Sequence, residues 1–169
     1  IGYSGEDGSA QNLDSLLGKI ISIDKDTSSH EIISYGHRNP QGLTYINEKN
    51  IIINTEHGPK GGDEININFL DTQTLPNYGW NISSYGINYD GTDPFKHSHA
   101  DYGFVEPFKY FTPSIGISQL FYMPKKLNSD NEKYLYITSL RAASIYIIKT
   151  NDEFNKIIDE DRIFFGQKR

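Results

Sequence analysis

Short segments rich in β-branched and aromatic residues follow one another along the chain, and no long helical pattern interrupts them. No extended window keeps an apolar period of about 3.6 residues, so long helices are not expected. Turn signals such as Gly61-Gly62 and the polar run 128–133 separate the segments. We therefore predict an all-β fold. The expected strands are Gly18–Asp24, Glu31–Tyr35, Leu43–Ile46, Asn50–Thr55, Glu64–Phe69, Tyr78–Ile82, Lys109–Phe111, Ile117–Tyr122, Tyr134–Thr138, Ser144–Lys149 and Arg162–Phe165.

Two of these segments share a pattern at their ends. Asn50–His57 and Tyr134–Arg141 each run from an apolar strand into small polar residues, and a His or an Arg follows. One strand precedes each segment and others follow, which indicates units of four antiparallel strands, the blades of a β-propeller. Two blades and one or two extra strands account for the chain. Because propellers close with about four to eight blades, we expect residues 1–169 to be one partial propeller domain of a longer protein, or to associate through open edges.

Composition and charge limit the possible partners. The net charge is −6, from 16 basic and 22 acidic residues, and no Lys or Arg stripe is present, so nucleic acid is not an expected partner. No apolar run approaches the roughly 20 residues that span a bilayer. The lack of cysteine excludes disulfides and Cys-ligated metals. The chain starts at Ile1 without an initiator Met, so a leader or further sequence is expected upstream.

Residues 83–107 are rich in Gly, Asn, Asp, His and Ser, which predicts a long inserted loop. Within it, His97, His99 and Asp101 have the residue types of a metal site, but no further ligand is evident. The sequence therefore favours a solvent-facing or substrate-facing loop there. The single tryptophan, Trp80, is most simply interpreted as a core anchor.

Glycines, prolines and charged residues concentrate in two stretches that lie between apolar strands. Gly36–Gly42 reads GHRNPQG, and Glu56–Glu64 reads EHGPKGGDE. Glycine-rich loops let main-chain groups approach a bound ion or a flat ligand closely, and binding residues are concentrated in loops at strand ends. The two stretches predict a ligand site at the edges of the sheets.

Arg38, His57 and Arg141 follow strands at corresponding places, so in a propeller they are expected to converge on one face near the axis. Arg38 lies in a turn constrained by Gly and Pro, which suits bidentate recognition of carboxylates. The alternative is three solvated charges at loop tips.

Two groups of oxygen donors have the chemistry of calcium sites. The main-chain oxygens of Gly58 and Pro59 suit Ca²⁺, although an isolated Gly-Pro is more often an ordinary turn. Asp63 and Glu64, with Tyr78, are either a second oxygen site or solvated loop acids.

The motifs together resemble those of the soluble quinoprotein glucose dehydrogenases and aldose sugar dehydrogenases, also called the glucose/sorbosone dehydrogenases. Their order and spacing agree over nearly the whole chain, and GHRNPQG is the most specific of them. The matching segments are Ser15–Asp24, Gly36–Leu43, Glu56–Asn66, Asn77–Trp80, Pro113–Ser118 and Ser139–Arg141.

The resemblance implies part of a six-bladed propeller that oxidises the C1 hydroxyl of aldoses to lactones, with hydride transfer to pyrroloquinoline quinone (PQQ). It implies that Gly58 and Pro59 bind the Ca²⁺ that polarises PQQ, and that Glu64 and Tyr78 belong to a second, structural calcium site. The cofactor contacts it implies are Arg38, Asn39, His57, Arg141 and Arg169.

The resemblance also places the general-base histidine of the family upstream of Ile1, and no histidine here corresponds to it. Because positioned acid–base groups contribute about 10²–10⁴-fold, we expect the isolated chain to be inactive. A periplasmic or secreted location is implied as well. One alternative is a non-catalytic extracellular propeller that serves as a binding module. A calcium-dependent hydrolase or lactonase is disfavoured, because the expected axial residues are basic rather than acidic.

Overall fold

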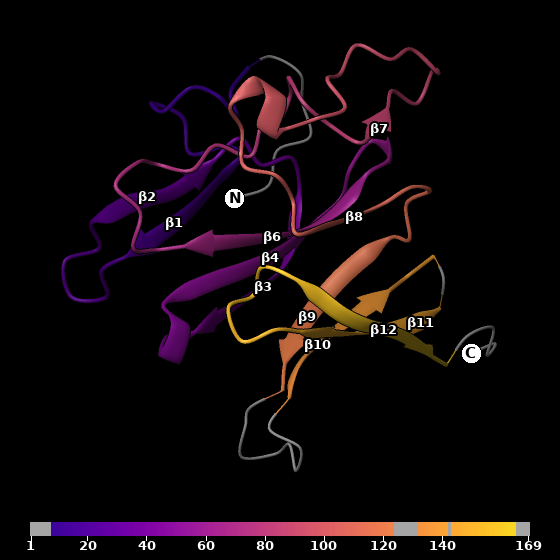
Figure 1. Ribbon diagram of the computed structural model, residues 1–169. Coiled ribbons are helices and arrows are strands. Elements are labelled where there is room, and N and C mark those ends of the chain that lie inside the picture. The colour runs from indigo at the N-terminus through magenta and orange to yellow at the C-terminus, as the bar shows by residue number, and fades with distance from the viewer. Residues whose placement is uncertain (1–7, 124–131, 142, 165–169) are drawn as a thin grey trace.

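Two four-stranded antiparallel sheets make up the body of the molecule (Figure 1). The computed structural model describes residues 8–123, 132–141 and 143–164. In each sheet the strands lie side by side in chain order, as in a propeller blade. The predicted all-β fold, with two blades of a β-propeller, is confirmed. The first blade contains β3 (Pro40–Ile46), β4 (Ile51–Glu56), β6 (Asp63–Phe69) and β8 (Lys109–Phe111); the second contains β9 (Ile117–Tyr122), β10 (Lys133–Ser139), β11 (Ser144–Thr150) and β12 (Ile157–Ile163).

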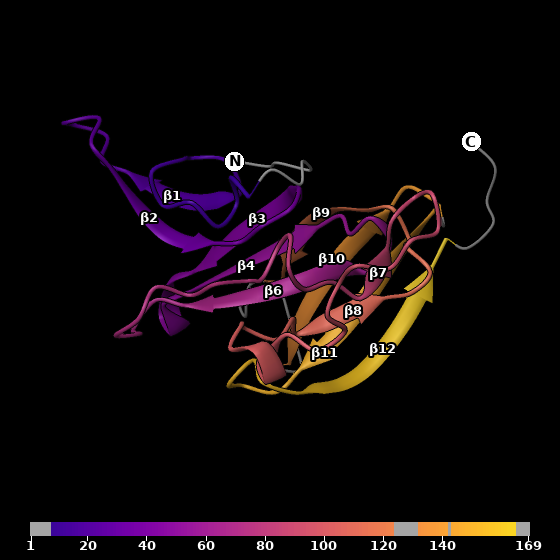
Figure 2. The same cartoon turned by 90° about the horizontal axis from the view of Figure 1, so that it is seen from above.

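Smaller elements flank the first blade. A two-stranded sheet of β1 (Lys19–Ile23) and β2 (His30–Tyr35) lies on one side of it, and the second blade lies on the other (Figure 2). The short strands β5 (Lys60–Gly61) and β7 (Gly86–Ile87) pair with each other. The helices among the described residues are the 3₁₀ turns Asn47–Lys49 and Ala100–Tyr102 (η2), and none is long and apolar enough to cross a bilayer.

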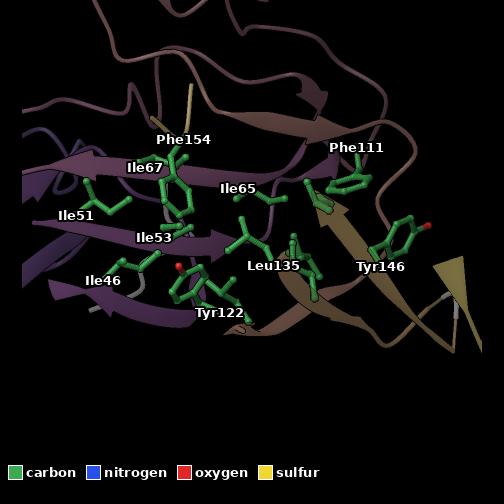
Figure 3. Packing of buried hydrophobic residues seen from close by; sticks show 14 of the residues in the cluster. Ile46, Ile51, Ile53, Ile65, Ile67, Phe111, Tyr122, Leu135, Tyr146 and Phe154 are labelled. Carbon is green, nitrogen blue, oxygen red and sulfur yellow. The ribbon is translucent and has the colours of Figure 1, made fainter. Parts of the chain in front are cut away.

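The apolar core lies between the two blades. Alternate residues of β4 and β6, such as Ile53 and Ile65, point toward the second blade, where Leu135 meets them (Figure 3). Ile137 of the second blade belongs to the same cluster. All four side chains are fully buried, and burial of an aliphatic side chain of this size stabilises the fold by about 1.5–3 kcal/mol. The inner strands β3 and β9 approach closely, because a Cβ at Gly42 would lie 2.8 Å from the main-chain nitrogen of Leu120.

The opposite face of the first blade is polar, although it too is buried. Successive side chains of a strand point to opposite faces, so the residues between the core isoleucines form a second layer. They face the segment that follows β2, where His37 bonds to Glu56. This polar layer contains Asn54, Glu56, Glu64, Asn66 and Asn68, all buried.

The predicted strand Tyr78–Ile82 is wrong. Gly79 has a positive φ of 85°, and its carbonyl accepts hydrogen bonds from the N–H groups of Ile82 and Ser83, which makes a turn. Only the start of this region runs beside β2, through a parallel bridge between Tyr35 and Asn77. A glycine in the left-handed region interrupts the extended conformation.

The last strand begins earlier than predicted, since β12 covers Ile157–Ile163 and not Arg162–Phe165. Its centre, Asp159–Asp161, is exposed and acidic, and charged residues are typical of a strand at the edge of a sheet. Phe165 lies outside the described residues. The predicted loop 83–107 contains β7 and η2, and the short strand β5 was not predicted.

The inter-blade core predicts a contrast between two isoleucine substitutions. Replacing Ile65 with Ala should lower the free energy of unfolding by about 2–5 kcal/mol, because it opens a cavity at a fully buried position. Ile158 on β12 is 52% exposed, so Ile158→Ala should change it by less than about 0.5 kcal/mol. Urea unfolding measures both, and equal losses would contradict this assignment of the core.

Candidate functional site

The carboxylate of Asp63 joins the two blades at one end of the sheets. Its Oδ1 accepts a hydrogen bond from the N–H of Gly58 at 3.2 Å. Its Oδ2 accepts from the N–H groups of Ile115 and Ile117, both at 3.0 Å. Asp63 is fully buried, so these donors replace the water that its charge would otherwise require. The loop after β4 is thereby attached to the segment before β9.

The segment before β9 also positions Arg141. The N–H of Arg141 donates to the carbonyl of Ile115 at 3.1 Å, and its Nη1 donates to the carbonyl of Ser114 at 3.3 Å. The hydroxyl of Ser139 donates to Ile115 as well, at 2.6 Å. On the other side, the N–H of Gly61 donates to Ser114 Oγ at 3.1 Å. His57 and Arg141 follow the equivalent strands β4 and β10, and both line the same cleft.

An open cleft of about 500 Å³ lies at this junction of the two blades. This volume falls within the range of small-molecule sites. Three basic side chains contribute to its lining, those of His57, Lys60 and Arg141. The acidic residue of the lining is Asp63, and its carboxylate accepts hydrogen bonds from main-chain N–H groups. The cleft therefore suits a small anionic ligand. The remaining lining residues are Gly58, Pro59, Gly61, Tyr85, Gly86, Ile87, Tyr89, Thr112, Pro113, Ser114 and Gly116.

Arg38 and His57 both line a second, much smaller cavity of about 10 Å³. That space is close to what one water molecule or ion requires. The main-chain N–H of Arg38 donates to Glu56 Oε2 at 2.7 Å, and its Nη1 donates to the carbonyl of His57 at 3.1 Å. Its Nε is buried and has no hydrogen-bond partner. A buried guanidinium donor without a partner is costly, and an anionic or carbonyl oxygen of a ligand would satisfy it.

The predicted site residues divide between the two cavities. Arg38, Glu64 and Tyr78 line the small cavity, Pro59 and Arg141 line the cleft, and His57 and Gly58 line both. Arg38 and Arg141 are thus on the two sides of His57. They do not share one cavity.

One further predicted residue, Asn39, lies elsewhere, and another is outside the part of the chain that the structure describes. Asn39 lines neither cavity. Its side-chain oxygen accepts a hydrogen bond from Gln41 at 3.0 Å, and its carbonyl accepts one from the N–H of His57 at 3.1 Å. Arg169 lies outside the described residues.

Buried acids surround the small cavity. Burial raises the pKa of the Glu64 carboxyl well above its ordinary value, and the nearby charge of Glu56 raises it further. Asn66 Nδ2 donates to both carboxylates, at 2.5 Å to Glu56 and 3.3 Å to Glu64. The hydroxyl of Tyr78 donates to the carbonyl of Ile67 at 2.8 Å. Within residues 8–123, 132–141 and 143–164, no group of three or more His, Asp or Glu residues has the arrangement of a metal site.

The structure separates His97 from His99, which lines the small cavity. His99 is buried and lies 3.7 Å from Glu64, measured from Nε2 to Oε1. Burial lowers the pKa of its imidazole. His97 is half exposed and bonds to Asp93 at 2.8 Å. His97 and His99 are separated by one residue in the sequence, and this spacing alone does not reveal that His99 is buried.

Tyr85 was not anticipated as a wall of the cleft. Its ring stacks on Tyr110 at 3.7 Å, and its hydroxyl donates to Glu106. The other carboxylate oxygen of Glu106 accepts the N–H groups of His99 and Ala100 at 3.0 Å. Lys60 was also missed, although it lies inside the EHGPKGGDE stretch and only its spacing from the glycines could have indicated it.

The fold is that of propeller blades, and a basic cleft with the volume of a small-molecule site lies at their junction. The chain belongs to the family described as Glucose / Sorbosone dehydrogenase, which it matches over residues 1–169.

Several known proteins are similar to this chain. Aldose sugar dehydrogenase YliI of Escherichia coli is 33% identical over 178 residues, which cover 96% of this chain and 46% of that protein. An uncharacterized protein of Synechocystis sp. is 34% identical over 172 residues, which cover 94% of this chain and 40% of that protein. The chain therefore spans less than half the length of these relatives.

Solved structures agree. The apo-form crystal structure of the soluble aldose sugar dehydrogenase from E. coli has a TM-score of 0.75 at 31% identity, over 97% of this chain and 50% of that one. A crystal structure of a glucose dehydrogenase has a TM-score of 0.78 at 30% identity, with the same coverage of both chains.

The raised pKa of Glu64 predicts a pH dependence of stability. The folded protein keeps the Glu64 proton to a higher pH than the unfolded chain does. Protonated Glu64 therefore contributes its full stability below the ordinary pKa of 4.5, and this contribution is lost as pH rises through the raised pKa. In calcium-free buffer, Glu64→Gln should therefore be more stable than the wild type at neutral pH, and the difference should vanish in acid.

Urea unfolding between pH 4 and 8 measures the difference. Glu31→Gln is the matched control, because it makes the same charge change at an exposed position of β2. A wild-type profile that parallels that of Glu64→Gln would show that Glu64 ionises normally.

Proposed function

We propose that this chain forms the cofactor-holding part of a PQQ- and calcium-dependent sugar dehydrogenase that oxidises the C1 hydroxyl of aldoses to lactones. The observation that carries the proposal is the basic cleft at the blade junction, with the unpartnered Nε of Arg38 behind it. Family membership supports the same chemistry, and similarity to an aldose sugar dehydrogenase supports an aldose substrate.

The residues of the cleft fit PQQ, a flat molecule with three carboxylates. Arg141 and Lys60 supply charged donors from the second blade and the first, and guanidinium groups suit carboxylates in particular. Arg38 lines the neighbouring small cavity and holds the carbonyl of His57, which borders the cleft. When bound, PQQ supplies the two-electron acceptor and Ca²⁺ the Lewis acid. In this proposal the chain's own residues bind and orient that group, and exclude water from it.

Two places fit calcium by the type of their donors. Gly58 and Pro59 line the cleft, and their main-chain oxygens are ligands that Ca²⁺ accepts. Glu64 and Tyr78 line the ion-sized cavity together with Glu56. The charge of the buried Glu56 adds to the raised pKa of the Glu64 carboxyl, and a divalent cation bound between the two carboxylates would relieve this repulsion. We propose the first as the cofactor calcium site and the second as a structural one.

Binding of PQQ tests the function. The wild-type chain with Ca²⁺ should bind PQQ in an absorbance titration, and EDTA should weaken the binding. Arg141→Gln should weaken it by about 10–100-fold, the loss expected for a hydrogen bond between charged groups.

Lys25→Gln is the matched control, because Lys25 is 90% exposed and removing it makes the same charge change far from the cleft. No binding by the wild-type chain, or equal losses in the two variants, would overturn the proposal. The non-catalytic binding module would be favoured if the chain bound aldoses but not PQQ.

Calcium should also stabilise the protein through the small cavity. Addition of millimolar Ca²⁺ should raise the Tm of the wild type more than that of Glu64→Gln, because the variant lacks the charged ligand. Differential scanning calorimetry measures the shift, with Mg²⁺ for comparison. Identical calcium shifts in both proteins would remove Glu64 from the site.

A further inference from the structure

The indole of Trp80 lies over the guanidinium of Arg38. The distance from Arg38 Cζ to the ring centroid is 5.1 Å, within the range of a cation–π interaction. Trp80 is only 4% exposed, so the contact is largely shielded from water. The indole also packs against Phe95, at 5.2 Å between ring centroids, and belongs to the small cluster with Ala10.

Main-chain and amide hydrogen bonds fix the backbone that carries this indole. Gln11 and Asn77 bond to each other through both amide groups, at 2.8 and 3.2 Å. Gln11 Nε2 also donates to the carbonyl of Trp80 at 2.5 Å. The N–H of Trp80 donates to the carbonyl of Gly36 at 2.9 Å. The Gln11–Asn77 amide pair therefore ties Trp80 to the start of the GHRNPQG stretch.

Gly36 shows how tightly the two motifs are packed. Its φ is 74°, and a Cβ at this position would lie 2.2 Å from Asn77 Oδ1 and 2.7 Å from the nitrogen of Gly79. Any other residue would displace the amide pair. The glycine that opens the most specific motif thus makes room for the loop that carries Trp80.

Arg38 is consequently restrained on three sides, and one donor is left over. Its main-chain N–H is bonded to Glu56, its Nη1 is bonded to the carbonyl of His57, and its Cζ lies over the Trp80 ring. The buried Nε has no partner. A long side chain normally loses considerable rotamer freedom when it binds a ligand. Here that freedom is already restricted in the free protein.

We propose that Trp80 is a positioning residue. It acts through Arg38, keeping the guanidinium where its Nη1 holds the carbonyl of His57, whose side chain borders the cleft. This inference rests on the proposed function, because the ligand is the one proposed for the neighbouring cleft. The predicted role of Trp80 as a core anchor is confirmed by its burial in the cluster with Ala10 and Phe95, and the proposal adds a second role to it.

A double-mutant cycle with PQQ as the ligand tests this role. Trp80→Leu should weaken PQQ binding by about 3–30-fold, the range that a partly buried cation–π contact gives, and Trp80→Phe by less. In an Arg38→Gln background, Trp80→Leu should cause no further loss, because the residue through which it acts is gone. A loss of the same size in both backgrounds would mean that Trp80 is structural only, and would overturn the proposal.

Because the sequence contains a single tryptophan, its fluorescence reports on this contact without any ligand. Arg38→Gln should change the emission of Trp80, whereas Arg141→Gln, with the same charge change on the other side of His57, should not. An emission spectrum unchanged by Arg38→Gln would show that the contact is absent. Failure of the wild-type chain to bind PQQ would overturn the proposed function instead, so the two failures are distinguishable.

Discussion

One buried carboxylate, that of Asp63, makes the candidate site possible. It bonds main-chain donors from the loop after β4 and from the segment before β9, and so sets the relative position of the two blades at the cleft. His57 comes from one of these blades and Arg141 from the other, so the cleft that both residues line forms only where the two blades meet. A charge this deeply buried is tolerated only because main-chain N–H groups surround it.

Much of the fold could be predicted from the sequence, because most of its signals are local. Short β-rich segments, and turns between them, predicted both blades, and the similar ends of β4 and β10 indicated that His57 and Arg141 are equivalent. Tyr78–Ile82 was misassigned because its aromatic residues favour a strand, while a single glycine with positive φ decides for a turn. The place of β12 could not be read either, since pairing with β11 and not local preference determines it.

The candidate site was predicted less completely, because its details depend on contacts between distant residues. The residue types that suit carboxylates and calcium were evident in GHRNPQG and EHGPKGGDE. That Arg38 and Arg141 lie on two sides of His57, and that Asp63 is a connector and not a solvated acid, depends on how the blades pack. The burial of His99 beside Glu64 is likewise a tertiary feature.

The two contrasting faces of the first blade have a consequence for how accurately the chain folds. Ile65 and Ile67 lie on one face of β6, and Glu64 and Asn66 lie on the other. A slip of β6 by one residue against β4 would exchange the faces, and would force a carboxylate into the hydrocarbon layer between the blades. Misregistered pairings of this strand are therefore strongly disfavoured, and the residues of the site themselves enforce the correct alignment.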